Sequence, residues 1–461
     1  MRGDGTDMLR TMKLPKAMIL FVGLVFVLFL MAACGDGDDD TPPVDVEPIS
    51  RGADIPIVIP AGEPIIIGIS TALTGGPVGV RGVEYRDAAI TAVERWKKAN
   101  GELIGGHEIE VHAEDDGCSN TEITMRAAGH LLRGEDGHQQ LPGLVGVIGP
   151  QCPAGVVAVI DDYAEAGIVM ISGSATATTL TDDQGEDGFF FRTAYRNDLE
   201  GTLIGLFVSG NEELGIESAV IVDNSETYGQ DLASSAARVS EEFGLTVDRV
   251  SIVEGTVDFG PAISQILSGD PDFVAFAGYN PEAALLYRQL RDAGFDGIFG
   301  AGDGAASATG FIEPVGAAEA EGVLFAACTL PLPKAFLDDF VELHGYEPTA
   351  SFPAQYADAA TILLNAIAAV AEEQADGSLV IEPTKLRDRV RSTATGGISG
   401  SIGFDENGDR LPPGVNSLEE FVAKALADLD PSAYQDLGLV PCQVQDGKLV
   451  SLGPGVEVRF D

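Results

Sequence analysis

Short apolar segments alternate with helical patterns along most of the chain, and this alternation limits the fold more than any other feature. The first apolar segment, 64–70, leads through a glycine-rich loop into a helical pattern over 84–98. In that pattern Ala89, Val93 and Trp96 recur at the spacing of one helix face. Strands that alternate with helices in this way form parallel sheets covered by helices. The chain is therefore predicted to be an α/β protein.

The alternation falls into two series, and the second begins near Asp198. Because 461 residues suit two domains better than one, we predict two doubly wound parallel-sheet lobes. The predicted strands are 64–70, 108–113, 144–150 and 168–172 in the first series and 219–223, 247–253, 273–278 and 297–302 in the second. The less regular remainder predicts strands at 322–328, 401–409 and 448–452, and helices at 335–344, 353–373 and 417–429.

The chain is strongly acidic, with 27 lysines and arginines against 72 aspartates and glutamates and a formal net charge of −45. Binding to a nucleic-acid backbone needs clustered basic side chains, so this charge argues against nucleic acid as a partner. A solvated acidic surface that keeps the protein soluble accounts for it.

The N-terminus has the pattern of an export signal. Basic residues precede an unbroken apolar stretch at 17–30, which is too short to span a bilayer comfortably and matches the core of a signal peptide. The stretch ends in Met-Ala-Ala-Cys34, which resembles a bacterial lipobox; an ordinary secretory signal with an incidental cysteine is the alternative. We predict a signal peptide with its lipobox over 1–34, lipidation of Cys34 and a location outside the cytoplasm, anchored to the cell membrane. The acidic, proline- and glycine-rich segment 35–62 is predicted to be a flexible linker.

Four further cysteines, an even number, fit an oxidising compartment and allow three disulfide pairings. The sequence has no Cys-x-x-Cys motif, phosphate-binding loop or Gly-x-Ser-x-Gly motif. His107 and His112 lie at an odd spacing on one predicted strand, which turns them to opposite faces. We therefore predict no metal, no cofactor and no enzymatic activity.

Seven short motifs occur in a fixed order along the chain. They include a Leu-Thr-Gly loop after the first strand, an Asp-Asp-Gly-Cys element and an Ile-Ser-Gly-Ser-Ala-Thr-Ala loop. The motifs lie at 73–75 with 84–85, 115–118, 147–149 with Cys152, 170–177, 228–229, 278–282 and 302–304. Together they resemble the leucine/isoleucine/valine-binding family of type I periplasmic binding proteins, over roughly residues 63–410.

The resemblance implies two lobes joined by a hinge of three crossovers, with the ligand between the lobes. It also implies a disulfide between Cys118 and Cys152. Pairing of Cys328 with Cys442 is our inference from the two cysteines that remain, and Cys328 lies at a predicted crossover. We place the crossovers near 192–198, 325–330 and 395–401, so that the first lobe comprises 63–194 plus 328–396 and the second 195–327 plus 397–461.

The resemblance further implies which residues bind the ligand. The backbone of Ser174 and the hydroxyl and amide of Thr176 would bind the carboxylate or ammonium group of an amino acid. Asp303 would face the ammonium group as its counter-charge, and Tyr228 and Tyr279 would close over the ligand from the second lobe. Such loops follow the carboxyl ends of parallel strands, where ligands of open α/β sheets bind.

One position departs from the family. Pro153 stands where the family often has a serine after the loop cysteine, and it offers neither a hydroxyl nor an N–H group. The carboxylate must then be bound by Ala154, Gly155 or the loop of Ser174, or the ligand is not a simple α-amino acid.

Val80 and Arg81 fall where the family lines the pocket for the ligand side chain. An inward Arg81 would suggest a ligand with an acidic or amide tail, whereas an outward Arg81 would be a solvated charge. We expect the outward orientation.

These features predict a monomeric, extracytoplasmic solute-binding lipoprotein. It would bind a small amino acid, branched-chain or polar, or an amide, and deliver it to the permease of an ATP-binding-cassette (ABC) importer. The lipid anchor would be its only contact with the membrane. A ligand-sensing receptor component of the same fold is the alternative, and no sequence feature separates the two.

Overall fold

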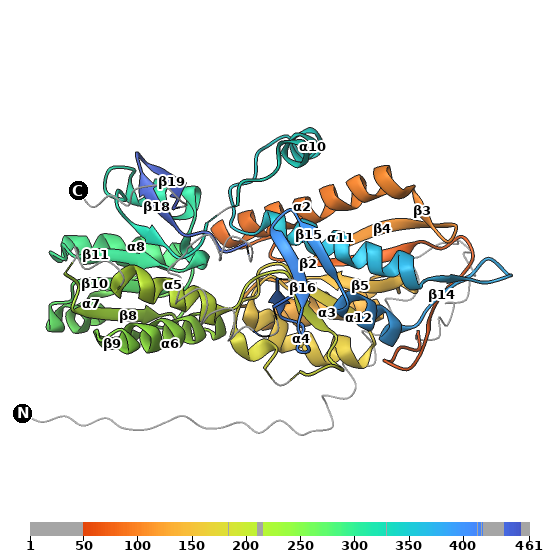
Figure 1. Cartoon of the computed structure of the whole chain (residues 1–461), viewed down its shortest axis with the longest axis horizontal. Helices are drawn as coiled ribbons and strands as arrows, with labels where there is room; N and C mark the ends of the chain where they lie inside the picture. The colour runs from red at the N-terminus through yellow and green to blue at the C-terminus, as the bar shows by residue number, and fades with distance from the viewer. Residues whose placement is uncertain are drawn as a thin grey trace, which may run out of the picture. The chain divides into compact units, whose positions relative to one another are not determined.

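The computed structural model describes residues 49–182, 184–209, 215–328, 330–412, 414–415, 417 and 438–452. The predicted signal peptide with Cys34, most of the predicted linker and all but the first residue of the predicted helix 417–429 lie outside these residues. The described residues form four sheets, and helices cover the two largest (Figure 1). Within this part of the chain, no helix is both long enough and apolar enough to cross a membrane.

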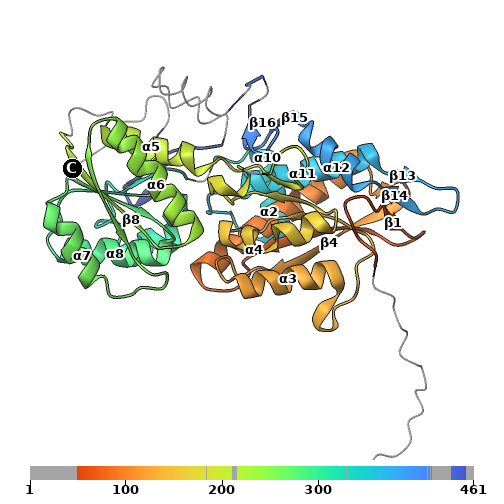
Figure 2. The ribbon, with the colours of Figure 1, turned by 90° about the horizontal axis from the view of Figure 1, so that it is seen from below.

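The first lobe is built on a six-stranded sheet in the order β3-β4-β2-β5-β6-β7. The sheet is parallel apart from β3, which runs antiparallel to β4. Helices α2 and α11 pack together on one face, and α3 and α4 pack on the other (Figure 2). The strands are β2 Ile65–Thr71, β3 Leu103–Ile104, β4 His107–Asp115, β5 Leu144–Ile148, β6 Val169–Ser172 and β7 Phe190–Arg192, and the helices are α2 Pro77–Asn100, α3 Thr121–Arg133, α4 Pro153–Glu165, α10 Lys334–His344, α11 Pro353–Val370 and α12 Pro383–Arg391.

The second lobe is built on a seven-stranded sheet in the order β19-β18-β12-β11-β10-β8-β9. Strands β8 to β12 are parallel, and the hairpin of β18 and β19 joins this sheet antiparallel to β12. The strands are β8 Ser218–Asp223, β9 Thr246–Ser251, β10 Phe273–Ala277, β11 Ile298–Ala301, β12 Leu324–Phe325, β18 Cys442–Gln445 and β19 Lys448–Ser451, and the helices are α5 Asn197–Ser209, α6 Thr227–Glu242, α7 Gly260–Ile266, α8 Asn280–Asp292 and α9 Glu313–Val315.

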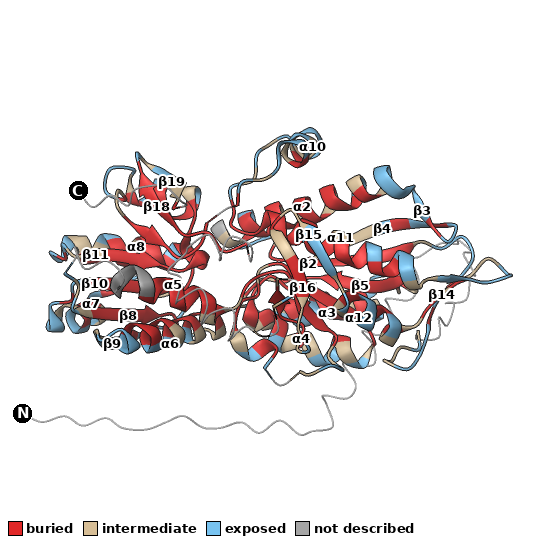
Figure 3. Ribbon diagram, in the orientation of Figure 1, coloured by how far each residue is buried: buried red, intermediate tan, exposed pale blue. Residues whose placement is uncertain are grey.

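Each lobe has its own buried core (Figure 3). All seven residues of β2 and all five residues of β10 are buried. Helices cover both faces of these strands, and for that reason they read in the sequence as unbroken apolar segments. The strand–helix alternation therefore predicted the central strands of both lobes.

Helix α2 begins at Pro77, seven residues before the helical pattern that we expected over 84–98. Gly76 precedes it with a φ of 70°, a conformation that favours glycine. Proline suits the first turn of a helix because its missing N–H group has no helical partner there. Because its first turns are glycine-rich, the sequence predicted a loop where this helix begins.

Two segments differ from the predicted organisation. β1 (Ile57–Ile59) lies inside the predicted linker, yet it pairs with β14 (Leu379–Ile381), which also pairs with β13 (Glu372–Glu373). Residues 400–411 were expected in the second lobe, but Ile402 is buried in the first-lobe core. They belong to a small sheet of β15 (Ala394–Gly397), β16 (Gly400–Phe404) and β17 (Arg410–Leu411).

Both disulfide pairings are confirmed. Cys118 follows β4 and joins Cys152, the residue directly before α4, at a Cα–Cα distance of 4.9 Å. Cys328 follows β12 and joins Cys442 of β18 at a Cα–Cα distance of 6.0 Å. The second disulfide thus holds the C-terminal hairpin against the strand with which it pairs.

A fully buried ion pair lies beside the first crossover. Arg192, the last residue of β7, donates from Nε to Asp409 Oδ1 at 2.5 Å, and Arg196 Nη1 donates to Asp409 Oδ2 at 2.7 Å. Arg192 and Asp409 are both buried. Burial would raise the pKa of Asp409, but the charges of Arg192 and Arg196 outweigh it and hold this pKa below its ordinary value.

We expect Asp409→Ala to lower the free energy of unfolding by about 3–5 kcal/mol, because Arg192 would be left buried without its counter-charge. The pKa of Asp409 is lower in the folded protein than the ordinary aspartate pKa of about 3.9. Asp409 therefore stabilises the folded protein fully above a pH of about 3.9, and this stabilisation is lost as the pH falls through the folded-state pKa. Denaturant titrations should therefore show a large difference in the free energy of unfolding between the variant and the unmodified protein at neutral pH, and a smaller difference in acid. Exposed Asp292 on α8 provides the control, and an equal effect of Asp292→Ala would contradict the assignment.

Candidate functional site

Two strand-end loops of the first lobe are tied together by hydroxyl groups. Ser172, at the end of β6, donates from Oγ to the Pro150 carbonyl at 2.7 Å and accepts the Ala175 N–H at 3.0 Å. Ser174 Oγ donates to the Gln151 carbonyl at 2.6 Å and lies 3.0 Å from the Tyr356 hydroxyl. The loop after β5 and the loop after β6 therefore form one fixed surface at the carboxyl edge of the sheet.

The facing loop of the second lobe centres on Asp303, which follows β11 and is buried. The Tyr195 hydroxyl donates to Asp303 Oδ2 at 2.9 Å, and the Asp303 N–H donates to Glu200 Oε1 at 2.6 Å. The Tyr228 hydroxyl accepts the Gly304 N–H at 3.1 Å. The aspartate is therefore held by groups from the crossover, from α5 and from α6.

Arg81 crosses from the first lobe to this loop. It lies on α2, is only 7% exposed, and donates from Nη1 to the Gly304 carbonyl at 2.6 Å. Its Nε lies 3.4 Å from the Tyr85 hydroxyl. The expectation of an outward Arg81 was therefore wrong; Val80 is the exposed member of the pair, with an exposed fraction of 51%.

A cavity of about 20 Å³ lies between the two surfaces, which is room for about one water molecule. Five of the predicted ligand-binding residues line it: Ser174, Asp303, Tyr228, Tyr279 and Arg81. Its other lining residues are Val78, Tyr85, Gln151, Cys152, Pro153 and Phe352. A wider, more open pocket of about 760 Å³ shares Val78 and Tyr279 with this cavity and also carries Glu122, Glu254 and Glu282.

Two other predicted residues, Thr176 and Ala154, do not belong to this lining. Thr176 is buried, and its carbonyl accepts the Asn197 N–H at 2.8 Å, which joins the loop to the start of α5. Among the described residues its Oγ1 has no hydrogen-bond partner. Ala154 is the second residue of α4, directly after Pro153, which does line the cavity.

The electrostatics of the site centre on three buried ionisable groups, Arg81, Asp303 and Glu200. Burial, and then the neighbouring charge of Asp303, raise the pKa of Glu200 well above its ordinary value. Burial also raises the pKa of Asp303, although Tyr228, Arg81 and Tyr195 oppose it. The two carboxyl groups together therefore favour retaining a proton, and Arg81 is the cation near Asp303.

Several residues in and beside the site were not predicted from the sequence. Glu200 looks like an ordinary acidic residue in the first turn of a helix, and Tyr195 lies in a crossover without a pattern. Asp116 belongs to a recognised motif, but its role was not foreseen. Its Oδ2 accepts the Gln151 N–H at 2.7 Å, and its Oδ1 accepts the Cys118 N–H at 2.9 Å. Burial raises the pKa of Asp116 to about 6, against these two hydrogen bonds.

The two histidines of β4 do not form a shared site. His107 is buried, with Nδ1 2.6 Å from the Glu63 carbonyl and Nε2 3.0 Å from the Gly377 carbonyl. His112 lies 3.6 Å from Glu110 at the surface. Their separate partners are those of residues on opposite faces of a strand.

Comparison with known proteins identifies similar sequences and structures. A family model described as periplasmic binding protein matches residues 64–414. The leucine-, isoleucine-, valine-, threonine- and alanine-binding protein of Pseudomonas aeruginosa is 27% identical over 362 residues, which cover 76% of this chain and 88% of that protein.

Solved structures that resemble the fold include two crystal structures. That of the leucine-binding protein LivK from Thermotoga maritima has a TM-score of 0.66 and 25% identity, and the match covers 84% of this chain and 98% of that one. That of LivJ from Streptococcus pneumoniae, in complex with isoleucine, has a TM-score of 0.64 and 22% identity, with 85% and 100% covered. The predicted two-lobed α/β fold is confirmed by these likenesses.

Proposed function

Because this chain belongs to the periplasmic binding protein family, we propose that it binds a small amino acid between its two lobes and delivers it to an ABC importer. Members of the family bind solutes outside the bacterial cytoplasm and are not enzymes. The relatives named for leucine, isoleucine and valine support an amino acid as the ligand. The lipobox-like sequence at Cys34 supports a lipid anchor at the outer face of the cell membrane, and we propose that the protein is a monomer.

The single observation that carries the proposal is the inter-lobe cavity with charges of both signs in its lining. An amino acid is a zwitterion, and it needs an anion near its ammonium group and donors near its carboxylate. We assign the ammonium group to Asp303 and the carboxylate to the loop of Ser174 and the amides of Ala154 and Gly155. The last two lie in the first turn of α4, where the free N–H groups and the helix dipole favour an anion.

The remaining predicted residues have supporting parts in this proposal. Tyr228 and Tyr279 stack with ring centroids 5.3 Å apart, and they would close over the ligand from the second lobe. Thr176 would hold the carboxylate-binding loop against the crossover through its bond to Asn197. Because the cavity is small, the ligand would enter when the lobes separate and Arg81 leaves the Gly304 carbonyl.

A ligand screen on the full chain in mild detergent tests this function. A ligand that binds only the folded protein raises the melting temperature with its concentration. Amino acids and small amides should be screened first, followed by calorimetry on those that raise the melting temperature. If none of them binds, the proposed function is wrong.

We expect Arg81 to select the ligand side chain. A buried guanidinium that loses the Gly304 carbonyl needs another acceptor, and an apolar ligand would leave it unpaired at a cost of about 1–3 kcal/mol. The protein should therefore bind amino acids with an acidic or amide tail about 10-fold or more tighter than leucine. Calorimetry on Arg81→Leu should show this preference reversed.

Lys98→Leu is the matched control, because Lys98 is an exposed cation on the same helix. It should leave the order of ligands unchanged. A preference for leucine in the unmodified protein would contradict the role given to Arg81 without affecting the proposal that the cavity binds an amino acid.

A further inference from the structure

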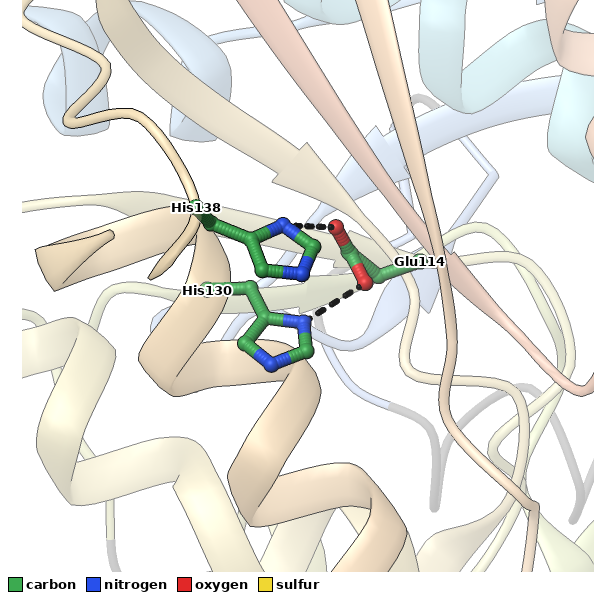
Figure 4. Close-up of side chains that lie close together, drawn as sticks. All are labelled: Glu114, His130 and His138. Carbon is green, nitrogen blue, oxygen red and sulfur yellow. Dashed lines mark hydrogen bonds and ion pairs between the residues drawn. The ribbon is translucent and has the colours of Figure 1, made fainter. Parts of the chain in front are cut away.

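Three potential metal ligands gather in the first lobe, and none of them lines the inter-lobe cavity. Glu114 is the penultimate residue of β4, His130 lies on α3, and His138 lies in the loop that follows this helix. One ligand atom from each residue lies within 4.8 Å of the others. Figure 4 shows both imidazole rings directed at the carboxylate. Residues from three separate elements therefore converge at one point.

The distances suit a small cation. His130 Nδ1 lies 3.0 Å from one Glu114 oxygen, and His138 Nδ1 lies 3.6 Å from the other. Ligand bonds of about 2.0–2.2 Å in a tetrahedral zinc site place neighbouring ligand atoms about 3.3 Å apart. The two observed distances bracket that value, although they join the nitrogens to different oxygens of the carboxylate. An ion bound by both nitrogens would therefore require the exposed His138 ring to turn out of its stack on His130.

A second carboxylate supports the coordination of His130 through Nδ1. The Nε2 of His130 lies 3.3 Å from Asp136 Oδ2. An imidazole that binds a metal through one nitrogen carries its proton on the other, and donating that proton to a carboxylate is the usual support of a metal-binding histidine. Asp136 is therefore placed to accept the Nε2 proton of His130 when a metal replaces the contact between Nδ1 and Glu114.

The exposure of the cluster also fits ion binding. The His130 and Glu114 side chains are 12% and 21% exposed, whereas that of His138 is 44% exposed. The two rings stack with centroids 3.7 Å apart and an angle of 14° between their planes. The inner pair would be fixed by the fold, and the outer histidine could close over an ion from solvent.

We propose that Glu114, His130 and His138 bind a zinc ion, with a water molecule as the fourth ligand. Two imidazoles and a carboxylate are a ligand set that suits Zn²⁺ and disfavours Ca²⁺ and Mg²⁺, which prefer oxygen ligands alone. The ion would join the loop after α3 to β4. Its role would be to stabilise the first lobe, separately from the ligand cavity.

Calorimetry with Zn²⁺ on the full chain, purified in detergent without a histidine tag, tests the proposal. One zinc ion per chain should bind saturably, and His130→Gln and His138→Gln should each weaken binding more than about 100-fold. Asp136→Asn should weaken it about 10- to 100-fold, because Asp136 only supports His130. Co²⁺ as a probe should give the visible absorption of tetrahedral coordination.

His112→Gln is the matched control, because His112 is a surface histidine that lies beside Glu110 on the same strand as Glu114. It should leave zinc binding unchanged. Circular dichroism would establish that every variant is folded. The proposal is overturned if Zn²⁺ does not bind saturably, or if His130→Gln and His112→Gln affect binding equally.

Discussion

Asp303→Asn is expected to weaken ligand binding about 100-fold or more. Removing one member of a buried, hydrogen-bonded charge pair costs about 2–5 kcal/mol, because the other charge remains buried without a partner. In the proposed complex that other charge is the ligand ammonium group. Asparagine keeps the size of the side chain and can still accept a hydrogen bond from Tyr195, which donates to Asp303 at 2.9 Å. The loop should therefore stay in place while its charge is lost.

Proton release distinguishes this role from a structural one. Burial raises the pKa of Asp303 and of its neighbour Glu200, so the pair favours holding a proton before the ligand binds. A ligand cation stabilises the ionised form and lowers these pKa values, so binding should release protons and become tighter as the pH rises. Calorimetry in two buffers with different ionisation enthalpies measures this release.

The Asp303→Asn variant should show less proton release as well as weaker binding. Asp292→Asn changes an exposed aspartate of α8 in the same lobe and should alter neither quantity. If Asp303→Asn bound the ligand with unchanged affinity, the proposed contact between Asp303 and the ligand ammonium group would be wrong.

Replacing Cys328 and Cys442 together by alanine is expected to lower the free energy of unfolding by about 5 kcal/mol. This disulfide closes a loop with a sequence separation of 114 residues, and the chain-entropy cost of opening a loop grows with its length. The separation between Cys118 and Cys152 is 34 residues, so their double replacement should cost about 4 kcal/mol. Denaturant unfolding of the two double variants measures both values.

The two variants should also differ in what they disturb. Cys118 and Cys152 lie beside the inter-lobe cavity, so their loss should weaken ligand binding. Cys328 and Cys442 fix the hairpin of β18 and β19 to β12, away from that cavity, so their loss should spare binding in the folded protein. If both double variants lost the same amount of ligand affinity, the prediction that only the disulfide between Cys118 and Cys152 supports ligand binding would be wrong.

The sequence predicted best those features that depend on neighbouring residues in the chain. Buried parallel strands such as β2 and β10 are short apolar segments wherever they occur. It predicted less well where two rules compete. The glycines before α2 indicated a loop, although Pro77 and the preceding Gly76 are also suitable for a helix start.

Side-chain orientation was hardest to predict, because it depends on distant residues. The buried Arg81 donates to the Gly304 carbonyl, which lies 223 residues further along the chain, and no local sequence pattern predicts that partner. His130 and His138 are eight positions apart on different elements, and β4 brings Glu114 beside both rings. We predicted no metal site because His107 and His112, which share one strand, point to opposite faces. The two histidines that converge on Glu114 lie instead on a helix and in a loop.

In the proposed function, the bond from Arg81 to the Gly304 carbonyl acts as an internal competitor for the ligand. While the guanidinium spans the two lobes, they can come together without any solute. The measured affinity is then the intrinsic affinity multiplied by the fraction of molecules whose arginine has swung away. A substitution at Arg81 would thus alter the selectivity and, in the same step, the balance between open and closed forms of the ligand-free protein.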